Sequence, residues 1–236
     1  MNRVTLLVFC LLGCTKPSGD TVFQAIDSGN IEILKGIRAE ANAFNIHNSD
    51  GQTPLTYIAK SDLPAETKKA MVSHLLGVGA NPNILNADGE TVLHVSSRFD
   101  RFENFVLSEF LLDQGVNINV RNKHKQTIAF DLFVVGTQSD DLLEFYIDWF
   151  VARGGDLNAI DSDGNSVLLT MISRVLCDEK TGYLAHDFSS PIEYLISKGA
   201  EVNVRNKKGE GAISLSRKTN ADDNQVELLK RYGARE

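Results

Sequence analysis

Hydrophobic residues in this chain recur at the spacing of α-helices rather than of β-strands. In Met71–Leu76 and again in Val106–Leu112, pairs of apolar residues follow one another about one helical turn apart. Side chains at that spacing share one face of a helix, whereas the residues of a strand alternate between two faces. The pattern predicts an all-α protein made of short helices.

The predicted helix ends carry residues suited to them. Thr53 stands before Pro54, and Thr91 opens a similar segment, so each hydroxyl can cap the first turn of a short helix. Longer helices are followed by glycines, which readily adopt the left-handed conformation that ends a helix: Gly79, Gly115 and Gly199. A short capped helix, a longer helix and a glycine together predict one helical hairpin.

These elements repeat along the chain. An asparagine stands six residues before a glycine in four places: Asn45 and Gly51, Asn83 and Gly89, Asn158 and Gly164, Asn203 and Gly209. Asn119 falls in the same register, but Lys125 stands at the glycine place, where we expect either backbone strain or a different turn. Repetition of this kind indicates a stack of similar units.

Three segments resemble the ankyrin repeat: Asp50–Leu55, Leu75–Asn83 and Asp88–His94. The resemblance extends over roughly residues 21–236. It implies an all-α ankyrin-repeat solenoid of helix-turn-helix units, with hairpin-like fingers and a role in protein binding rather than catalysis. The glycine places lie 36 to 45 residues apart, against about 33 in the family pattern, and the largest insertion lies around 174–190.

The repeat register divides the chain into segments. We expect an N-terminal cap at 21–45, full units at about 46–83, 84–119, 120–158 and 159–203, and a C-terminal cap at 204–236. The residues expected to face inward in the two caps are Val22, Phe23, Ile26, Ile31, Ile33 and Leu34 in the first, and Val226, Leu228 and Leu229 in the second. Phe105 and Trp149 are also expected to belong to the core.

The first residues resemble a secretion signal. Arg3 precedes the apolar run Val4–Leu12, which is too short to cross a bilayer as a helix. Leu-Leu-Gly-Cys at 11–14 resembles the lipobox of bacterial lipoproteins, which implies lipidation of Cys14 after removal of residues 1–13. An ordinary signal peptide or a chance cysteine is the alternative. Residues 14–20 would form a lipidated tether. The protein would lie in the periplasm, and Thr15 favours anchoring in the outer rather than the inner membrane.

Charge and cysteine content narrow the possible partners. The formal net charge of −7 disfavours nucleic acid and anionic lipid, so membrane contact is expected only through the lipid on Cys14. Without Cys10 and Cys14, only Cys177 would remain, and no disulfide could form within the chain. We expect a monomer that binds another envelope protein.

The chain offers little chemistry for catalysis. Its histidines show no metal-ligand spacing, so neither a cofactor nor a metal is expected. His94 falls in the ankyrin-like box, and the resemblance implies internal hydrogen bonds for it. The alternative is an enzyme in which Cys177 is a nucleophile and His186 its base. The leading interpretation is a non-enzymatic protein.

The resemblance implies that partners bind the finger tips and the inner face of the first helices. The residues expected to bind a partner lie at or just behind the tips, with one aromatic in the turn between two helices: Asp50, Asp88, Glu90, Phe99, Arg121, Lys123, Lys125, Asp161, Asp163, Arg205, Lys207 and Lys208. The fingers read as acidic, acidic, basic, acidic and basic. Either a partner matches this alternation, or neighbouring fingers simply attract each other.

Location and binding character together suggest a function. We expect a module that binds and inhibits a periplasmic enzyme such as a peptidoglycan hydrolase. In overall character the chain resembles the lipidated ankyrin proteins that predatory bacteria use against their own wall-cutting enzymes, and this resemblance implies a self-protection role. The alternative is an envelope scaffold or stress-related adaptor that inhibits nothing. The 174–190 insertion is either a partner-contacting loop or padding.

Overall fold

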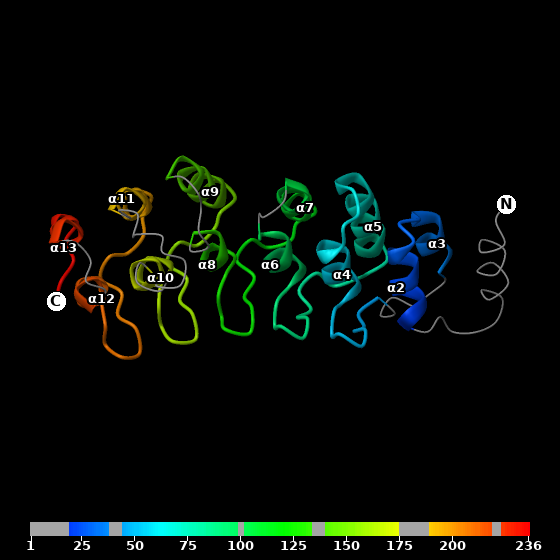
Figure 1. Ribbon diagram of the computed structural model, residues 1–236, viewed down its shortest axis with the longest axis horizontal. Coiled ribbons are helices and arrows are strands. Elements are labelled where there is room, and N and C mark those ends of the chain that lie inside the picture. The colour runs from blue at the N-terminus through cyan, green and yellow to red at the C-terminus, as the bar shows by residue number, and fades with distance from the viewer. Residues whose placement is uncertain (1–18, 38–43, 99–101, 134–139, 175–188, 219–222) are drawn as a thin grey trace. The chain divides into compact units, whose positions relative to one another are not determined.

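The computed structural model describes residues 19–37, 44–98, 102–133, 140–174, 189–218 and 223–236. The chain divides into two units, Met1–Asn117 and Ile118–Glu236. Figure 1 shows helices connected by long loops within each unit. In the described residues there is no strand, only an isolated bridge between Ile160 and Ser166, so the all-α prediction is confirmed.

Helical hairpins build the N-terminal unit. Its three pairs are α2 (Gly19–Asp27) with α3 (Ile31–Gly36), α4 (Pro54–Lys60) with α5 (Ala65–Gly77), and α6 (Val92–Ser96) with α7 (Phe102–Asp113). The first helices of the pairs contact one another in the order α2, α4, α6, and the second helices in the order α3, α5, α7. The unit therefore has two helical layers, with the fingers beside the first.

The C-terminal unit repeats this plan. Its pairs are α8 (Ala129–Leu132) with α9 (Asp140–Ala152), α10 (Val167–Arg174) with α11 (Ser189–Ser197), and α12 (Ala212–Lys218) with α13 (Asp223–Arg231). Again α8, α10 and α12 pack in one layer, and α9, α11 and α13 in the other. None of the described helices combines the length and apolarity needed to cross a bilayer.

Hydroxyl groups begin α4, α6 and α10, as the sequence predicts, whereas α8 begins after Ile128 without a side-chain cap and the buried Thr127 hydroxyl makes no hydrogen bond. Thr53 caps α4 by accepting a hydrogen bond from the backbone N–H of Thr56, whose hydroxyl accepts one from the Thr53 N–H. Thr91 caps α6 in the same position. Before α12 the usual hydroxyl is missing, and Ser214 compensates by accepting from the Gly211 N–H at 2.9 Å and donating to the Gly211 carbonyl. The different sequence thus reaches a similar helix start.

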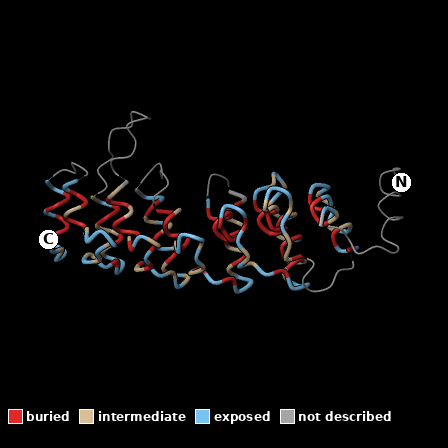
Figure 2. Tube along the Cα trace, turned by 90° about the horizontal axis from the view of Figure 1, so that it is seen from below, coloured by how far each residue is buried: buried red, intermediate tan, exposed pale blue. Residues whose placement is uncertain are grey.

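Buried apolar residues lie where the two layers meet and where neighbouring hairpins face each other (Figure 2). Most cap residues expected to face inward are buried, but Ile31 and Ile33 are only partly buried, since short α3 contacts mainly α2 and α5. Phe105 and Trp149 are likewise partly exposed. Their helices turn other side chains to the core: Leu107 and Leu111 in α7, and Leu143, Ile147 and Phe150 in α9.

Repeat asparagines fasten each unit's hairpins together. Asn158 accepts a hydrogen bond from the Glu201 N–H at 2.8 Å and donates to the Gly199 carbonyl at 3.1 Å. The same two-ended contact is made at three other positions: Asn45 with Asn81 and Gly79, Asn119 with Asp156 and Gly154, and Asn203 with Arg235 and Gly233. These asparagines therefore serve the stack and are not available to a ligand.

Asn158→Ala should lower the free energy of unfolding by about 1–3 kcal/mol, because it removes two hydrogen bonds and leaves two backbone groups without their partner. Asn158→Asp keeps the acceptor for Glu201 and loses only the donor to Gly199, so its cost should be smaller. Urea denaturation followed by circular dichroism measures both. Equal stability of the alanine variant and the natural protein would show that the contact does not hold the hairpins.

Left-handed residues shape the loops. The glycines at the repeat's finger turn have positive φ, for example +68° at Gly51 and +75° at Gly209. Lys125 keeps the same turn with φ +61°. Among the described residues it is the only non-glycine residue with a positive φ. Of the two outcomes open for Lys125, the structure therefore shows strain rather than a different turn.

Lys125→Gly is expected to raise the free energy of unfolding by about 0.5–1 kcal/mol, because glycine adopts positive φ without the Cβ clash. Lys123→Gly, two residues earlier in the same turn, lacks this relief and should be neutral or destabilising. Thermal unfolding of both variants decides the point. A loss of stability at position 125 would mean that the lysine side chain contributes more than its backbone conformation costs.

Candidate protein-interaction surface

Each finger is built around one asparagine or aspartate. In the third finger, the Asn122 side-chain oxygen accepts hydrogen bonds from the N–H groups of His124 at 2.8 Å and Gln126 at 3.0 Å. Four residues occupy the corresponding place in the other fingers: Asn48, Asn86, Asp161 and Asn206. A side-chain oxygen that binds the loop backbone replaces part of a turn's hydrogen bonding. The tips are thereby fixed in shape.

The turn-forming role of these five residues was not predicted from the sequence, although Asp161 was named for partner binding. Each one stands three residues before the glycine place that aligned the repeats, so the signal was present in the same register. The turn preference of Asn and Asp would have predicted their role. These five residues stabilise the fingers, whereas other residues at the tips expose their side chains to a partner.

Backbone hydrogen bonds join neighbouring fingers within each unit. In the N-terminal unit the Ala87 N–H donates to the Gly51 carbonyl at 2.8 Å. In the C-terminal unit the Ser162 N–H donates to the backbone carbonyl of His124 at 2.7 Å, and the Lys207 N–H donates to the backbone carbonyl of Asp163 at 2.8 Å. Successive tips of one unit are therefore held in a fixed order and can present their side chains as one surface.

In the N-terminal unit the predicted acidic tips are only partly available. Asp50 is exposed, and exposed Asp88 forms an ion pair with Lys60 at 3.0 Å. Glu90, which the sequence places at the tip, is instead buried with its carboxylate bonded to Arg98, so the finger does not display it. Burial of a charge requires such a partner. Phe99 lies outside the described residues.

A groove of about 650 Å³ lies in this unit between the first finger and the first helices. Its charged lining includes Asp27, Asp50, Asp62 and Lys60. The Tyr57 hydroxyl donates to Asp27 at 2.6 Å, and this hydrogen bond, together with burial, raises the pKa of Tyr57. The groove is thus acidic with one aromatic wall.

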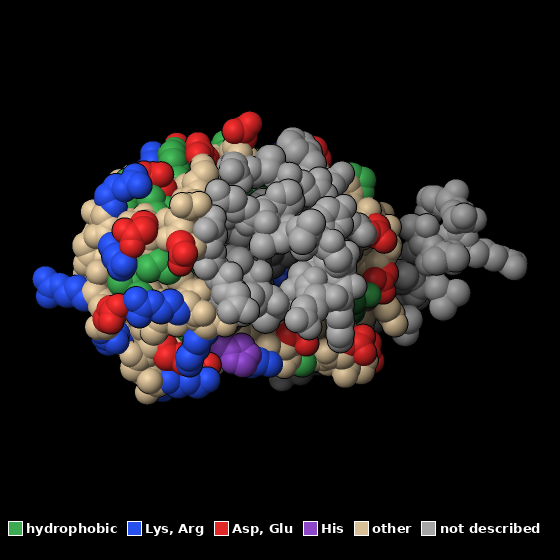
Figure 3. Space-filling view, turned by 60° about the vertical axis from the view of Figure 1, so that its left-hand side comes forward, with side chains coloured by type: hydrophobic (Ala, Val, Ile, Leu, Met, Phe, Trp, Pro, Cys, Tyr) green, Lys and Arg blue, Asp and Glu red, His purple; other side chains and the backbone are tan. Residues whose placement is uncertain are grey.

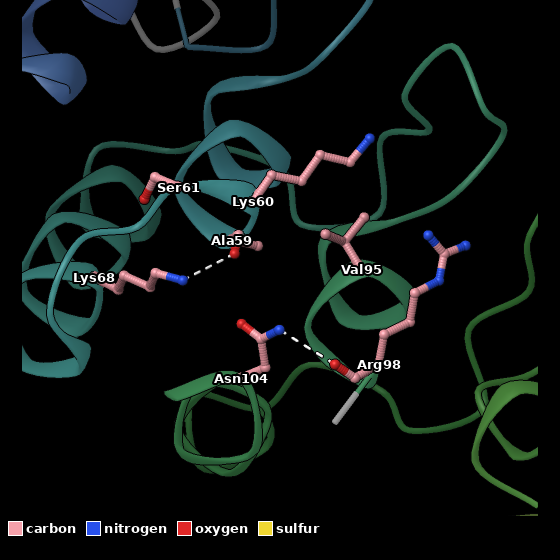
Figure 4. A pocket seen from close by; sticks show the side chains of 7 residues that line it. All are labelled: Ala59, Lys60, Ser61, Lys68, Val95, Arg98 and Asn104. Carbon is pink, nitrogen blue, oxygen red and sulfur yellow. Dashed lines mark hydrogen bonds between the residues drawn. The ribbon is translucent and has the colours of Figure 1, made fainter. Parts of the chain in front are cut away.

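A second, smaller cavity of about 190 Å³ is lined by basic and amide side chains (Figure 4). Lys68 of α5 is 2% exposed and donates to the Ala59 carbonyl at the end of α4. Asn104 of α7 donates to the Arg98 carbonyl after α6 in the same manner. Carbonyls at helix ends lack helical partners. Both polar side chains therefore bind the end of a neighbouring helix.

The C-terminal unit carries all six predicted basic residues in exposed positions. We call the basic edge the set Arg121, Lys123 and Lys125 of the third finger and Arg205, Lys207 and Lys208 of the fifth. Figure 3, which brings the C-terminal end forward, shows Lys and Arg side chains over the left part of the view and part of its lower border, with Asp and Glu side chains among them. Both fingers present cations on the same side of this unit.

The fourth finger between them is less acidic than predicted. Asp161 is 8% exposed and accepts hydrogen bonds from the N–H groups of Asp163 and Asn165, so its carboxylate stabilises the turn rather than being displayed, unlike the sequence expectation. Asp163 is exposed. The alternation of the C-terminal unit is therefore two groups of three cations with one displayed carboxylate between them.

Two arginines of the basic edge also hold their fingers. Arg121 donates to the Lys125 carbonyl at 2.9 Å and to the Ile160 carbonyl at 2.8 Å. Arg205 donates to the Gly209 carbonyl at 2.9 Å. Among the described residues, the ammonium groups of the four lysines make no such hydrogen bond, so these lysines are the better candidates for a partner's carboxylates.

Of the histidines and cysteines considered for chemistry, His94 lies among the described residues, whereas the candidate pair Cys177 and His186 does not. His94 is fully buried, with its Nδ1 2.8 Å from the Thr91 hydroxyl, as the ankyrin-like box implies. No group of three His, Cys, Asp or Glu side chains in the described part of the chain could hold a metal. Cys14, Cys177 and His186 lie outside that part.

Known proteins with ankyrin repeats are similar to this chain in sequence. The family model of ankyrin repeats, in three copies, matches residues 22–122. The B-cell lymphoma 3 protein homolog of Mus musculus is 26% identical over 205 residues, which cover 83% of this chain and 40% of that protein. The chain spans less than half the length of the curated relatives it matches.

Two solved structures have the same fold. An ankyrin repeat domain from Acinetobacter baumannii matches with a TM-score of 0.62 and 16% identity, over 91% of this chain and 98% of that one. A chain from the complex of a predatory endopeptidase of Bdellovibrio bacteriovorus with an immunity protein matches with a TM-score of 0.56 and 19% identity, over 91% and 99%.

The described fold is thus an all-α ankyrin-repeat fold, and residues 22–122 carry recognised ankyrin repeats. Proteins of this kind bind other proteins and are in general not enzymes. The fixed, charged fingers described above are consistent with an ankyrin-repeat protein-interaction module.

Proposed function

We propose that this protein is a lipid-anchored binding module of the bacterial envelope that inhibits a periplasmic enzyme, a peptidoglycan hydrolase of the same cell. The observation that carries the proposal is the set of fixed fingers that displays charges outward, together with the similarity to a chain of an endopeptidase–immunity protein complex. Because that similarity is 19% in sequence, it supports the fold, and the inhibitory role is our proposal.

The proposed anchor is Cys14, and its tether to α2 is short. A chain of about six residues spans roughly 20 Å when extended. Lipidation would therefore keep the repeats close to the membrane surface, within reach of enzymes that work on the neighbouring wall. An outer-membrane position in the periplasm follows from Thr15 as an expectation of the same proposal.

Inhibition would work by covering the enzyme. Specific complexes of stable proteins bury about 800 Å² on each partner. A row of fingers with the groove behind it offers an extended surface of that kind, and placing it over the mouth of an active site would exclude the substrate. No catalytic residue of this chain takes part in such a mechanism.

Co-purification tests the proposal. A tagged protein should be recovered from detergent-solubilised envelope with one predominant partner, and adding the purified protein should lower the hydrolysis of peptidoglycan by that partner. Cys14→Ser should move the protein out of the membrane fraction without changing binding. A stoichiometric complex with a fully active enzyme would contradict inhibition and leave the scaffold alternative; no partner at all would contradict the binding function.

A further inference from the structure

The basic edge has a chemistry that selects a partner surface. Six exposed cations lie on the third and fifth fingers of one unit, in a protein whose net charge is −7. The fourth finger contributes exposed Asp163, whereas Asp161 faces its own turn. A local charge opposite to that of the whole molecule steers association through one face.

The edge is fixed before any partner arrives. Asn122 and Asn206 bind the backbone of their tips, and the hydrogen bonds from Ser162 to His124 and from Lys207 to Asp163 join the three fingers. A surface that needs no ordering loses less free energy on binding. The spacing of its charges is therefore a property that a partner can match.

Nearby acidic groups do not cancel the edge. Glu210 is bonded to Asn206 and Lys218, and these hydrogen bonds lower the pKa of Glu210. The Glu236 carboxylate pairs with Arg217, and the Glu236 backbone oxygen accepts a hydrogen bond from Arg205, so Arg205 is a cation of the edge that is already engaged. Exposed Asp156 and Glu201 lie in the turns that precede the fourth and fifth fingers, and they limit the positive region to the tips.

We propose that the basic edge binds an acidic protein surface that presents two groups of carboxylates separated by a hydrogen-bond donor or cation facing Asp163. This inference rests on the proposed binding function and names the chemistry of the partner. Single-sign polyanions such as nucleic acid or an anionic bilayer would place negative charge against Asp163 and would be resisted by the net charge elsewhere. An acidic rim on an enzyme can match all three fingers.

Charged contacts of this type set specificity and the association rate. Exposed charges are screened over about 8 Å at physiological salt. Since packed helices lie about 8–10 Å apart, successive fingers act almost independently on a partner. A matching partner must therefore carry its charges in the same order, which distinguishes recognition from general attraction.

The test uses a fluorescent synthetic peptide with two Asp/Glu clusters on either side of a Lys, and a second peptide in which the Lys is Glu. The natural protein should bind the first peptide more tightly than the second, and more tightly than phosphatidylglycerol vesicles or single-stranded DNA. The double variant K123E/K208E should weaken binding of the first peptide by about tenfold or more. Unchanged melting would show that the variant is folded.

A matched control separates local from total charge. K35E/K230E makes the same change in net charge on helices away from the fingers, at lysines that pair with Glu32 and Glu227. Its peptide binding should change less than about twofold. An equal loss in both double variants, or tighter binding of vesicles or DNA by the natural protein, would overturn the proposed acidic protein surface.

The envelope partner recovered by co-purification gives the second readout. If that complex resists K123E/K208E, the basic edge is not the contact surface, although the binding function stands. If no envelope partner exists while the patterned peptide binds as expected, the proposed function fails and the chemistry of the edge stands. Weakened binding of both the partner and the peptide supports the inference.

Discussion

Gly51→Ala is expected to lower the free energy of unfolding by about 2–4 kcal/mol, the largest effect of any single methyl group in the fingers. The glycine has φ +68°, where a Cβ is strained. The added Cβ would also lie 2.4 Å from the Cβ of Ala87 in the next finger. Because the Ala87 N–H donates to the Gly51 carbonyl, the two tips cannot separate without losing that bond.

Gly209→Ala provides the matched control for this prediction. Gly209 occupies the same turn position with φ +75°, but no atom lies within 4 Å of its added Cβ. Its cost should be the backbone strain alone, about 1 kcal/mol. For a protein of this size, the Gly51 variant should melt about 5–10 °C lower than the natural protein. Equal melting of the two variants would show that the fingers are not in close contact.

Lys68→Ala is expected to lower the free energy of unfolding by about 3–4 kcal/mol. A lysine would ordinarily be expected at the protein surface, where its replacement costs little. The Lys68 side chain is almost completely buried, and its ammonium group donates to the Ala59 carbonyl at the end of α4. Alanine would enlarge the adjoining cavity and leave that carbonyl without this donor. Both losses fall on the contact between α4 and α5.

Lys68→Met divides the effect into its parts, because methionine keeps most of the buried chain and lacks the donor. It should cost about 1–2 kcal/mol, close to the value of one hydrogen bond to a charged group. Lys69→Met is the control on the same helix, because partly exposed Lys69 forms an ion pair with exposed Glu66. Its cost should stay below about 0.5 kcal/mol. Denaturant titration of the three variants would contradict this account if Lys68 and Lys69 proved equivalent.

The helices and turns of this fold were readable because the chain repeats them. Thr53, Thr91 and the turn glycines lie at offsets that recur, and hydrogen-bond geometry makes each of these residue types suitable for its place. Lys125 could be recognised as an exception for the same reason. The local physics of capping and positive φ acts over a few residues, so sequence spacing was sufficient.

The site was less predictable, because burial is decided between segments. Glu90 and Asp161 stand beside exposed Asp88 and Asp163 in sequence, yet Arg98 binds the first and the finger backbone binds the second. Nothing in a charge pattern distinguishes a displayed carboxylate from one that makes a turn. Lys68 shows the same limit for a cation, since only the position of the α4 terminus explains its burial.

The acidic and basic regions of the two units follow from this correction. The acidic groove of the N-terminal unit uses Asp27 and Asp62, which were not among the predicted site residues, beside the predicted Asp50. The basic edge keeps all six predicted cations. The sequence predicts five tips of alternating charge. In the structure, the N-terminal unit instead has one acidic groove and the C-terminal unit one basic edge.

The most direct measurement of the central claim is a titration of the co-purified envelope enzyme with this protein, with release of soluble peptidoglycan fragments as the readout. Our account predicts that activity falls linearly to near zero at one protein per enzyme, and that K123E/K208E shifts the curve to higher concentration while K35E/K230E does not. Full activity at saturating protein, with the complex intact, would contradict it.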